Sequence, residues 1–330
     1  MEQDILTQAE VAQRILSGKT LLLAGDERLL AQLPKGKWIG GTIPYFITPS
    51  QGGLSSREKI FVTDISELAV SIEIKAYDEN ALGQVYCEEG DGGFSVIIIP
   101  ALSPAHLAFA LNAPNYKNFG AKPLVGWVSG VHLDDLGKAT PKVFDGLTGE
   151  SHGQKAVVMR VALAPGRAVD VGIVNIFEQG AGDILTFKED GFSCHEVAVN
   201  GVNENFADYI KRNGLDTKLP LVADYYGVKV NVSFQSVGDS GGEVKFYAPV
   251  FSGARYKHAR PVENYADAFS AELIKLGLSG DGIAFSCNCI LNYLYLGLEG
   301  KGTASFVGPI TFGEIAYQLL NQTLVYIKAH

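Results

Sequence analysis

Short apolar segments typical of β-strands outnumber helical ones along this 330-residue chain, and this imbalance constrains its fold most. Several consecutive segments, among them residues 155–163 and 168–177, are joined by links too short for the helical crossover that parallel neighbours require. The sequence therefore predicts mixed, largely antiparallel β-sheets with helices packed on their outer faces. Such a layered sandwich belongs to the α+β or α/β class.

Apolar periodicity separates two kinds of strand. Residues 68–77 alternate apolar and polar side chains, as expected for a strand with one solvated face, whereas residues 94–100 are apolar throughout and should be buried on both faces. Residues 227–237 also alternate. Their pattern predicts one strand whose polar side chains face away from the apolar ones, with Lys229, Asn231 and Ser233 opposite Val228, Val230, Val232 and Phe234.

Capping signals mark the expected helices. Thr7 and Glu10 form a capping-box pattern, and Gly18 stands where a left-handed residue would follow the helix. Ser103 precedes Pro104, which indicates a cap followed by a proline in the first turn. The clearest helical pattern covers residues 262–277.

The length of the chain exceeds what one hydrophobic core normally fills, so we expect two domains, or two halves that share a layered core. Segments around Gly40, Gly126 and Gly308 each run from an apolar pair through glycine to small or polar residues. An internal duplication would bring these strand ends to one cleft. A chance recurrence of a common pattern is the alternative.

Composition and charge exclude several classes of partner. Hydrophobic residues make up 47% and charged residues 19% of the chain, which is typical of a globular protein rather than a disordered one. The formal net charge is −9 without any basic run, which argues against a nucleic-acid partner. The apolar stretches are far shorter than the roughly 20 residues of a membrane-spanning helix. No membrane partner is therefore expected, and the acidic, amphipathic N-terminus does not have the pattern of a secretory signal.

The four cysteines, Cys87, Cys194, Cys287 and Cys289, are too few and too scattered for a disulfide scaffold, which favours a reducing cytoplasm. Cys287 and Cys289 share one face of the expected strand, but zinc sites usually have a wider spacing and a second pair. Buried inert thiols are the favoured interpretation. Cys287 as a nucleophile is the alternative. We expect neither a metal nor a cofactor.

The run GWVSG resembles the nucleophile elbow of hydrolases, with its serine displaced by one position. On a strand this displacement turns Ser129 to the opposite face, and His132 would point away from it. A small residue at a close-packed strand end is therefore the favoured interpretation of Ser129.

Glu314 also allows two interpretations. Thr311 and Glu314 match a capping box for a helix over residues 315–320, which is the interpretation that we favour. Alternatively, Glu314 points into a pocket and binds an ammonium or hydroxyl group.

WIGGTIPYF and KPLVGWVSGVHLDD in the first part of the chain, and AFSC, VGPITFGEI and NQTLVYI in the second, follow one another in a distinctive order. Over most of the chain these segments resemble the FIST family, named for F-box and intracellular signal transduction. Two departures occur. Asn288, Cys289 and Ile290 fill a span where that family often has an arginine, and Trp127 replaces a small residue after Gly126.

The resemblance implies a sensory module of two related halves. A FIST N-like half would cover residues 1–200, with a short N-terminal helical extension, and a FIST C-like half residues 201–330. The implied ligand is a small molecule, for example an amino acid or a related metabolite, bound in a cleft between the halves. The chain would act as a stand-alone intracellular binder, or pass its state to a signalling protein partner by contact.

The ligand site that we predict combines backbone and side-chain groups. Glycines would let the ligand approach the backbone, the hydroxyls of Thr42, Ser129 and Thr311 would bond it, and Glu314 would hold a cationic or hydroxyl group. The full predicted set is Gly40, Gly41, Thr42, Gly126, Ser129, Gly130, Cys287, Asn288, Gly308, Thr311, Gly313 and Glu314. The alternatives are a hydrolase or transferase with Cys287 or Ser129 as nucleophile, and a protein-interaction module.

Overall fold

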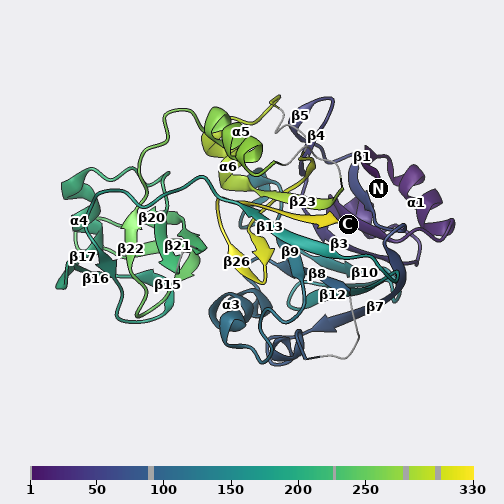
Figure 1. Cartoon of the computed structure of the whole chain (residues 1–330), viewed down its shortest axis with the longest axis horizontal. Helices are drawn as coiled ribbons and strands as arrows, with labels where there is room; N and C mark the ends of the chain where they lie inside the picture. Colours follow the sequence, from purple (N-terminus) through teal and green to yellow (C-terminus); the bar gives the residue numbers. More distant parts are fainter. Residues whose placement is uncertain (1, 88–92, 226–227, 278–281, 302–305) are drawn as a thin grey trace. The chain divides into compact units, whose positions relative to one another are not determined.

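The computed structural model describes residues 2–87, 93–225, 228–277, 282–301 and 306–330 of the chain (Figure 1). Strands dominate, helices are few and most strand pairs are antiparallel, so the predicted mixed α+β class is confirmed. The chain forms two compact units. Unit 1 comprises Met1–Val174, Ser270–Leu319 and Thr323–His330, and unit 2 comprises Asn175–Phe269 and Leu320–Gln322.

The first sheet of unit 1 carries two helices. Its strand order is β1 (Glu2–Leu6), β6 (Ile60–Asp64), β2 (Leu21–Gly25), β3 (Trp38–Thr42), β10 (Val143–Asp145) and β11 (Glu150–His152). Helices α1 (Gln8–Leu16) and α2 (Glu27–Leu30) pack on it through Val11, Ile15 and Leu30. The predicted capping box of Thr7 and Glu10 begins α1, and Gly18 follows the helix with a φ of 84°.

The second sheet of unit 1 is covered by α3 (Pro104–Asn112) and by the short 3₁₀ helices η1 (Leu82–Gln84) and η2 (Ala113–Asn115). Its strand order is β26 (Gln318–Leu320), β25 (Glu314–Ala316), β9 (Leu124–Ser129), β8 (Phe94–Pro100), β12 (Ala156–Leu163) and β7 (Ala69–Tyr77). The hydroxyl of Ser103 caps α3, as predicted. Strand β8 is almost wholly buried, which also agrees with its apolar sequence.

The third sheet of unit 1 joins segments from both ends of the chain. Its order is β13 (Val169–Val174), β27 (Leu324–Ala329), β23 (Ile283–Cys289), β24 (Gly308–Thr311), β4 (Tyr45–Thr48) and β5 (Gly52–Ser55). Helix α6 (Ile290–Leu296) directly follows β23 and packs through Leu291 and Tyr293. The sequence does not predict this helix, because ILNYLYL is apolar on nearly every side and so lacks a helical period.

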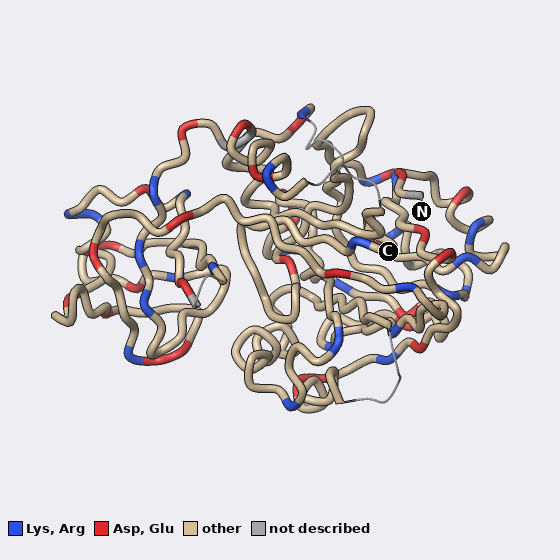
Figure 2. The backbone as a smooth tube through the Cα atoms, viewed as in Figure 1, with Lys and Arg blue, Asp and Glu red and all other residues tan. Residues whose placement is uncertain are grey.

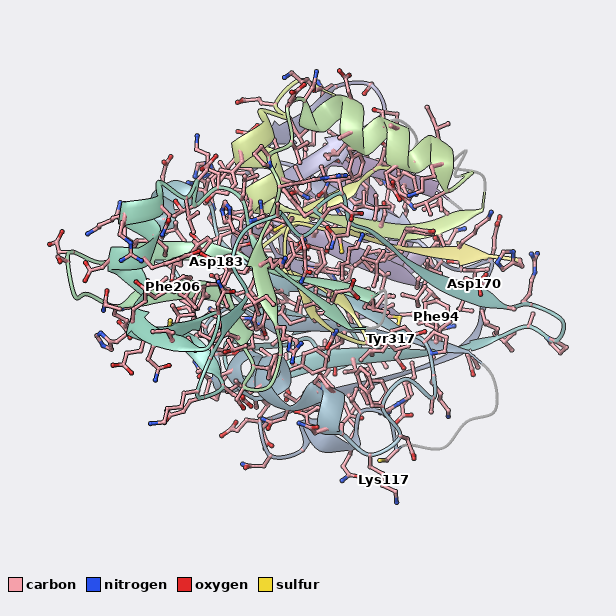
Figure 3. The ribbon with its side chains drawn as sticks, turned by 60° about the vertical axis from the view of Figure 1, so that its left-hand side comes forward. Phe94, Lys117, Asp170, Asp183, Phe206 and Tyr317 are labelled. Atoms are coloured by element: carbon pink, nitrogen blue, oxygen red, sulfur yellow. The ribbon has the colours of Figure 1, made fainter. Side chains whose placement is uncertain are left out.

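Unit 2 is built around an aromatic core. One sheet has the order β17 (Val202–Asn205), β16 (Glu196–Val199), β14 (Leu185–Thr186), β22 (Tyr256–His258), β18 (Leu221–Tyr225) and β19 (Val228–Val232), and a smaller one the order β15 (Gly191–Cys194), β21 (Val244–Val250) and β20 (Phe234–Val237). The first residue of α4 (Phe206–Asn213), labelled in Figure 3, packs with Phe187, Phe234 and Phe246. The helix predicted over residues 262–277 is α5 (Tyr265–Lys275), whose residues up to Phe269 belong to unit 2 and whose later residues belong to unit 1.

The prediction of a single strand over residues 227–237, whose first residue lies outside the described ranges, is wrong. The segment divides into β19 and β20, and both Asn231 and Ser233 are buried. The amide of Asn231 donates to the carbonyl of Asn321, and the hydroxyl of Ser233 donates to Gln322 Oε1 at 2.7 Å. Because these partners come from a distant segment of unit 2, the local alternation of side chains cannot reveal them.

The prediction of a helix over residues 315–320, capped by Thr311 and Glu314, is also wrong. These residues form β25 and β26, joined at Tyr317, whose φ is 63°. Glu314 lies opposite Trp127 in the ladder between β25 and β9. Pairing with a distant strand therefore overrides the local capping signal.

The compact units do not follow a boundary at residue 200, because residues 175–199 lie in unit 2 and residues 270–319 return to unit 1. The division into compact units does not test whether the two parts of the chain are related to the halves of the FIST family, so the FIST-like halves stay a prediction. Charged residues of both signs are spread along the chain (Figure 2). None of the helices in the described ranges is long and apolar enough to cross a membrane.

Candidate functional site

A cavity of about 180 Å³ lies in unit 1, where β2, β3 and β9 end. The carboxyl ends of sheet strands are a common place for ligands, because the loops that follow them supply polar groups. We call this space the Arg57 cavity. Its lining consists of Gly25, Asp26, Glu27, Arg28, Thr42, Ile43, Pro44, Arg57, Gly130, Val131, His132, Asp135, Ala139 and Thr140.

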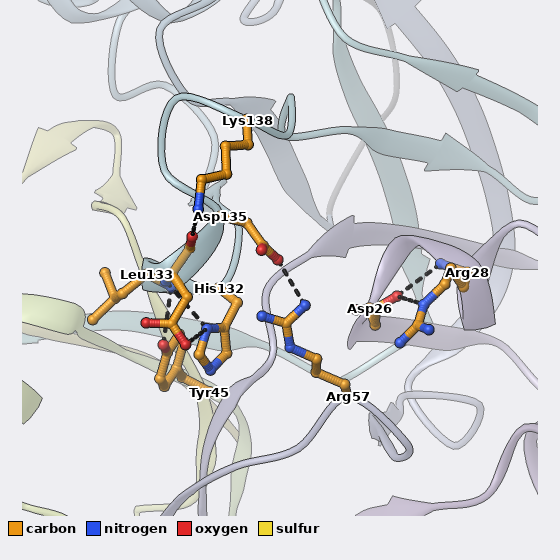
Figure 4. A network of polar contacts seen from close by, with 9 residues as sticks. Asp26, Arg28, Tyr45, Arg57, His132, Leu133, Asp135 and Lys138 are labelled. Atoms are coloured by element: carbon orange, nitrogen blue, oxygen red, sulfur yellow. Dashed lines mark hydrogen bonds and ion pairs between the residues drawn. The ribbon is translucent and has the colours of Figure 1, made fainter.

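The lining carries charges of both signs (Figure 4). Arg57 Nη1 lies 2.7 Å from Asp135 Oδ2, and Arg28 Nε lies 3.0 Å from Asp26 Oδ1. The side chains of Arg57 and Asp135 are 37% and 33% exposed, so a ligand can reach both. A ligand with a single charge would satisfy one partner of the pair, whereas a ligand with a carboxylate and an ammonium can satisfy both.

One wall of the cavity is held by stacked rings. The ring of His132 stacks on Tyr45 with a centroid distance of 5.3 Å, and His132 Nδ1 accepts a hydrogen bond from the backbone N–H of Asp134 at 3.2 Å. The Tyr45 hydroxyl accepts one from the backbone N–H of Leu133 at 3.1 Å. Burial raises the pKa of Tyr45, so this phenol stays protonated at neutral pH. These contacts hold the ring of His132 against Tyr45 at the cavity wall.

Two of the predicted site residues, Thr42 and Gly130, line the cavity. The Thr42 hydroxyl donates to the Gly130 carbonyl at 2.7 Å and accepts from the Lys142 N–H at 2.9 Å. The Gly130 N–H in turn donates to the Thr42 carbonyl at 2.7 Å. Because its proton is used in this way, the Thr42 hydroxyl fixes the loops that form the cavity and can only accept from a ligand.

A second group of predicted residues forms a buried cluster in unit 1, which we call the Glu314 cluster: Asn288, Thr311, Glu314 and Thr323. Glu314 Oε2 accepts hydrogen bonds from the Thr323 hydroxyl at 2.9 Å and from its N–H at 3.3 Å. The Thr311 hydroxyl lies 3.3 Å from Glu314 Oε1 and from the Asn288 carbonyl. All four residues are buried, and none of them lines the Arg57 cavity.

Burial raises the pKa of Glu314 to about 8, so its carboxyl is protonated at neutral pH. A neutral carboxyl can exchange hydrogen bonds with a hydroxyl, but it cannot balance the charge of an ammonium group. Ligand contact by Glu314 and Thr311 therefore stays a prediction, and the Arg57 cavity carries the accessible charges.

Gly126 and Gly308 allow neighbouring strands to approach each other closely. A Cβ on Gly126, whose φ is 158°, would lie 1.7 Å from the carbonyl oxygen of Ile97 on β8. A Cβ on Gly308 would lie 2.0 Å from the carbonyl oxygen of Ser286 on β23. The group that lies close to each glycine in the structure is the backbone of another strand, and the predicted approach of a ligand to them stays a prediction.

Gly40 and Gly41 on β3 are also close to protein atoms. A Cβ on Gly41 would lie 2.7 Å from Ile98 Cγ2 and 3.1 Å from the Cβ of Ser129, and one on Gly40 would lie 3.3 Å from the carbonyl oxygen of Leu23. Ligand contact by these glycines likewise stays a prediction.

The predicted segments nevertheless meet inside unit 1. The Cys287 thiol donates to the Gly126 carbonyl at 3.4 Å, and the Gly313 carbonyl accepts from the Val128 N–H at 2.8 Å. The ring of Trp127 stacks on Phe285 at 5.5 Å. Strands β3, β9, β23 and β25 thus share one interior, although only Thr42 and Gly130 of the predicted set reach the cavity.

Comparison with known proteins places these residues in a family. Residues 6–330 match a family described as a family of unknown function, DUF6976. The chain belongs to this family. A search of curated proteins found no match to the sequence. The DUF6976 match covers residues of both compact units.

In this DUF6976 chain, the environment of Cys287 does not favour a nucleophile. The residue is 1% exposed, and burial raises the pKa of its thiol well above the usual value. Since thiol reactivity follows the thiolate form, Cys287 should be inert at neutral pH.

We expect iodoacetamide at neutral pH to leave Cys287 unmodified in the folded protein and to modify it after unfolding in guanidinium. Mass spectrometry of the cysteine peptides would measure this. Cys87, which is partly exposed, serves as the internal control. Labelling of Cys287 as fast as Cys87 in the folded state would contradict this expectation and support the enzyme alternative.

Ser129 of this DUF6976 chain is fully buried, and its hydroxyl has no hydrogen-bond partner among the described residues. His132, the nearest candidate base in the sequence, stacks on Tyr45. The described residues thus provide no activating base for Ser129, and the hydrolase interpretation gains no support.

The charged lining of the cavity is what sequence reasoning misses. Arg57 and Asp135 are 78 residues apart, and nothing local links them. One signal was present: Asp26 directly follows β2, and His132 comes three positions after the end of β9. Polar residues that immediately follow buried strands, here strands of two different sheets, are the signal that could have linked these groups. Among the described residues, no cluster of three or more His, Cys, Asp or Glu could hold a metal ion.

Proposed function

We propose that this chain is a cytoplasmic sensory module that binds a small zwitterion, such as an amino acid or a related metabolite, in the Arg57 cavity. The observation that carries the proposal is the accessible pair of Arg57 and Asp135 at the cavity wall. The volume of about 180 Å³ is below the roughly 300–1,000 Å³ of pockets for drug-sized ligands. A ligand of metabolite size is therefore favoured.

Each charged group of such a ligand would have a matched partner. The planar guanidinium of Arg57 can bind a carboxylate through two parallel hydrogen bonds, and the carboxylate of Asp135 can accept from an ammonium group. The ligand would replace the direct ion pair of these two side chains with two ion pairs through itself. Groups that are already ordered, such as the stacked His132, reduce the entropy lost on binding.

Two further points support the sensory role and the cytoplasmic location in this proposal. The resemblance to the FIST family implies a sensory role with a signalling protein as partner. None of the four cysteines, which all lie in the described ranges, forms a disulfide, and this fits a protein that works in a reducing compartment. The proposal differs from the sequence-based prediction in one respect, since the cavity is lined by residues 25–140 alone rather than by both predicted halves.

A thermal-shift screen of the common amino acids and related metabolites tests the proposal. A ligand that binds the folded state stabilises it by about 2.7 kcal/mol at a hundredfold excess over its dissociation constant. We expect at least one zwitterion to raise the melting temperature in a saturable manner. If no compound of this class does so, the proposal is wrong.

The hit should then be titrated by calorimetry against wild type, Arg57→Gln and the control Arg212→Gln, whose arginine pairs with Glu204 in unit 2. Loss of a charge-assisted contact should weaken binding at least about tenfold in Arg57→Gln, while the control binds like wild type. The methyl ester of the hit should bind more weakly to wild type than the free acid does, but equally well to Arg57→Gln. Equal losses for the ester in both proteins would place the carboxylate elsewhere.

A further inference from the structure

Strand β7 forms one edge of the second sheet of unit 1 (Figure 1). It pairs antiparallel with β12, and the pairing is regular from Ser71 to Tyr77. Among the described residues, no strand pairs with the outer side of β7. Backbone N–H and C=O groups along such an edge are a template for another strand.

The side chains of β7 offer few of the features, such as proline, that prevent an edge strand from pairing with another strand. Residues 69–77 include no proline, and Val70 is 67% exposed. Ile72 and Ile74 are partly buried on one face, while Glu73 and Lys75 are exposed on the other. A long edge that keeps apolar residues partly exposed is a predicted association site, unless its charges oppose association.

The charged side chains of β7 indicate which strand would pair with this edge. We propose that β7 pairs antiparallel with β7 of a second copy of this chain, about a two-fold axis at Ile74. In that register Glu73 of each copy lies opposite Lys75 of the other, which forms two cross-strand pairs of opposite charge. Centring the pair on Glu73 or on Lys75 would instead place like charges opposite each other.

Contacts within one copy already hold these charges at the edge. Arg160, the β12 residue opposite Glu73, lies 3.3 Å from its carboxylate, and Lys75 Nζ lies 5.1 Å from the centre of the Tyr77 ring. The side chains of Glu73, Lys75 and Tyr77 lie on the same face, because side-chain direction repeats every second residue. The dimer would join two six-stranded sheets into one continuous sheet with a self-complementary interface.

Sedimentation velocity of the full chain over a range of concentrations tests the proposal. Wild type should show a monomer–dimer equilibrium. Glu73→Lys places two lysines opposite two lysines, and Lys75→Glu does the same with glutamates, so each variant should raise the dimer dissociation constant at least about tenfold. The double variant Glu73→Lys/Lys75→Glu restores opposite charges and should dimerise like wild type. An equimolar mixture of the two single variants should form a heterodimer.

Thermal melts control for folding, because exposed ion pairs contribute at most about 1 kcal/mol and the variants should melt close to wild type. A wild type that stays monomeric at the highest soluble concentration would overturn the proposal. So would a dimer whose dissociation constant is the same in both single variants as in wild type, because its contact would then lie elsewhere.

Discussion

Raising the pH from about 5 to about 9 is expected to lower the free energy of unfolding by several kcal/mol, because Glu314 is buried in its protonated form. The usual pKa of this carboxyl is 4.5, and burial raises it to about 8 in the folded state. The unfolded chain therefore loses this proton at lower pH than the folded protein does. The stabilisation is fully present below pH 4.5 and is lost as the pH rises through about 8. At about 1.4 kcal/mol per pKa unit, the loss amounts to roughly 5 kcal/mol.

Urea unfolding of wild type and Glu314→Gln at several pH values measures this effect. The glutamine side chain has nearly the same shape and cannot lose a proton, so the variant should keep most of its stability at high pH. Glu150→Gln, at a side chain that is 69% exposed, is the matched control and should follow the wild-type profile. If wild type and Glu314→Gln give parallel profiles, Glu314 does not carry a buried proton.

Gly126→Ala is expected to lower the free energy of unfolding by about 3 kcal/mol or more, the range of strongly destabilising core substitutions. The added methyl group would lie 1.7 Å from the carbonyl oxygen of Ile97, so the parallel pair of β8 and β9 must separate locally. The positive φ of 158° adds backbone strain for any residue with a Cβ.

The midpoint of urea unfolding tests this prediction. Gly83→Ala is the control, because the nearest atom to its added Cβ is a ring carbon of Tyr116 at 3.9 Å, an ordinary contact distance. The control should remain within about 0.5 kcal/mol of wild type. A Gly126→Ala variant as stable as Gly83→Ala would show that β8 and β9 do not approach as closely as described.

Sequence reasoning succeeds where an element depends on its own residues. The hydroxyls of Thr7 and Ser103 cap the helices that they were predicted to begin, and the apolar run of β8 is buried. Sequence reasoning fails where a residue from a distant part of the chain determines the local structure. Glu314 pairs with Trp127 of β9 instead of capping a helix, and Asn231 can be buried because the Asn321 carbonyl accepts a hydrogen bond from its amide.

The candidate site follows the same rule. The glycine segments were predicted to let a ligand approach the backbone, and at Gly126 the structure places the carbonyl oxygen of Ile97 on a neighbouring strand there. The charged groups of the Arg57 cavity come from the segments that follow β2, β5 and β9, including the short helix α2. Their chemistry is visible in the sequence, whereas their proximity depends on the order of strands in the sheets.

A crystal structure of the protein with its thermal-shift hit is the most direct test of ligand binding. We expect ligand density in the Arg57 cavity, with the carboxylate of the ligand on the Arg57 guanidinium and its amino group on Asp135. Density at another place, for example beside Glu314, together with an unchanged ion pair between Arg57 and Asp135, would contradict the proposed site.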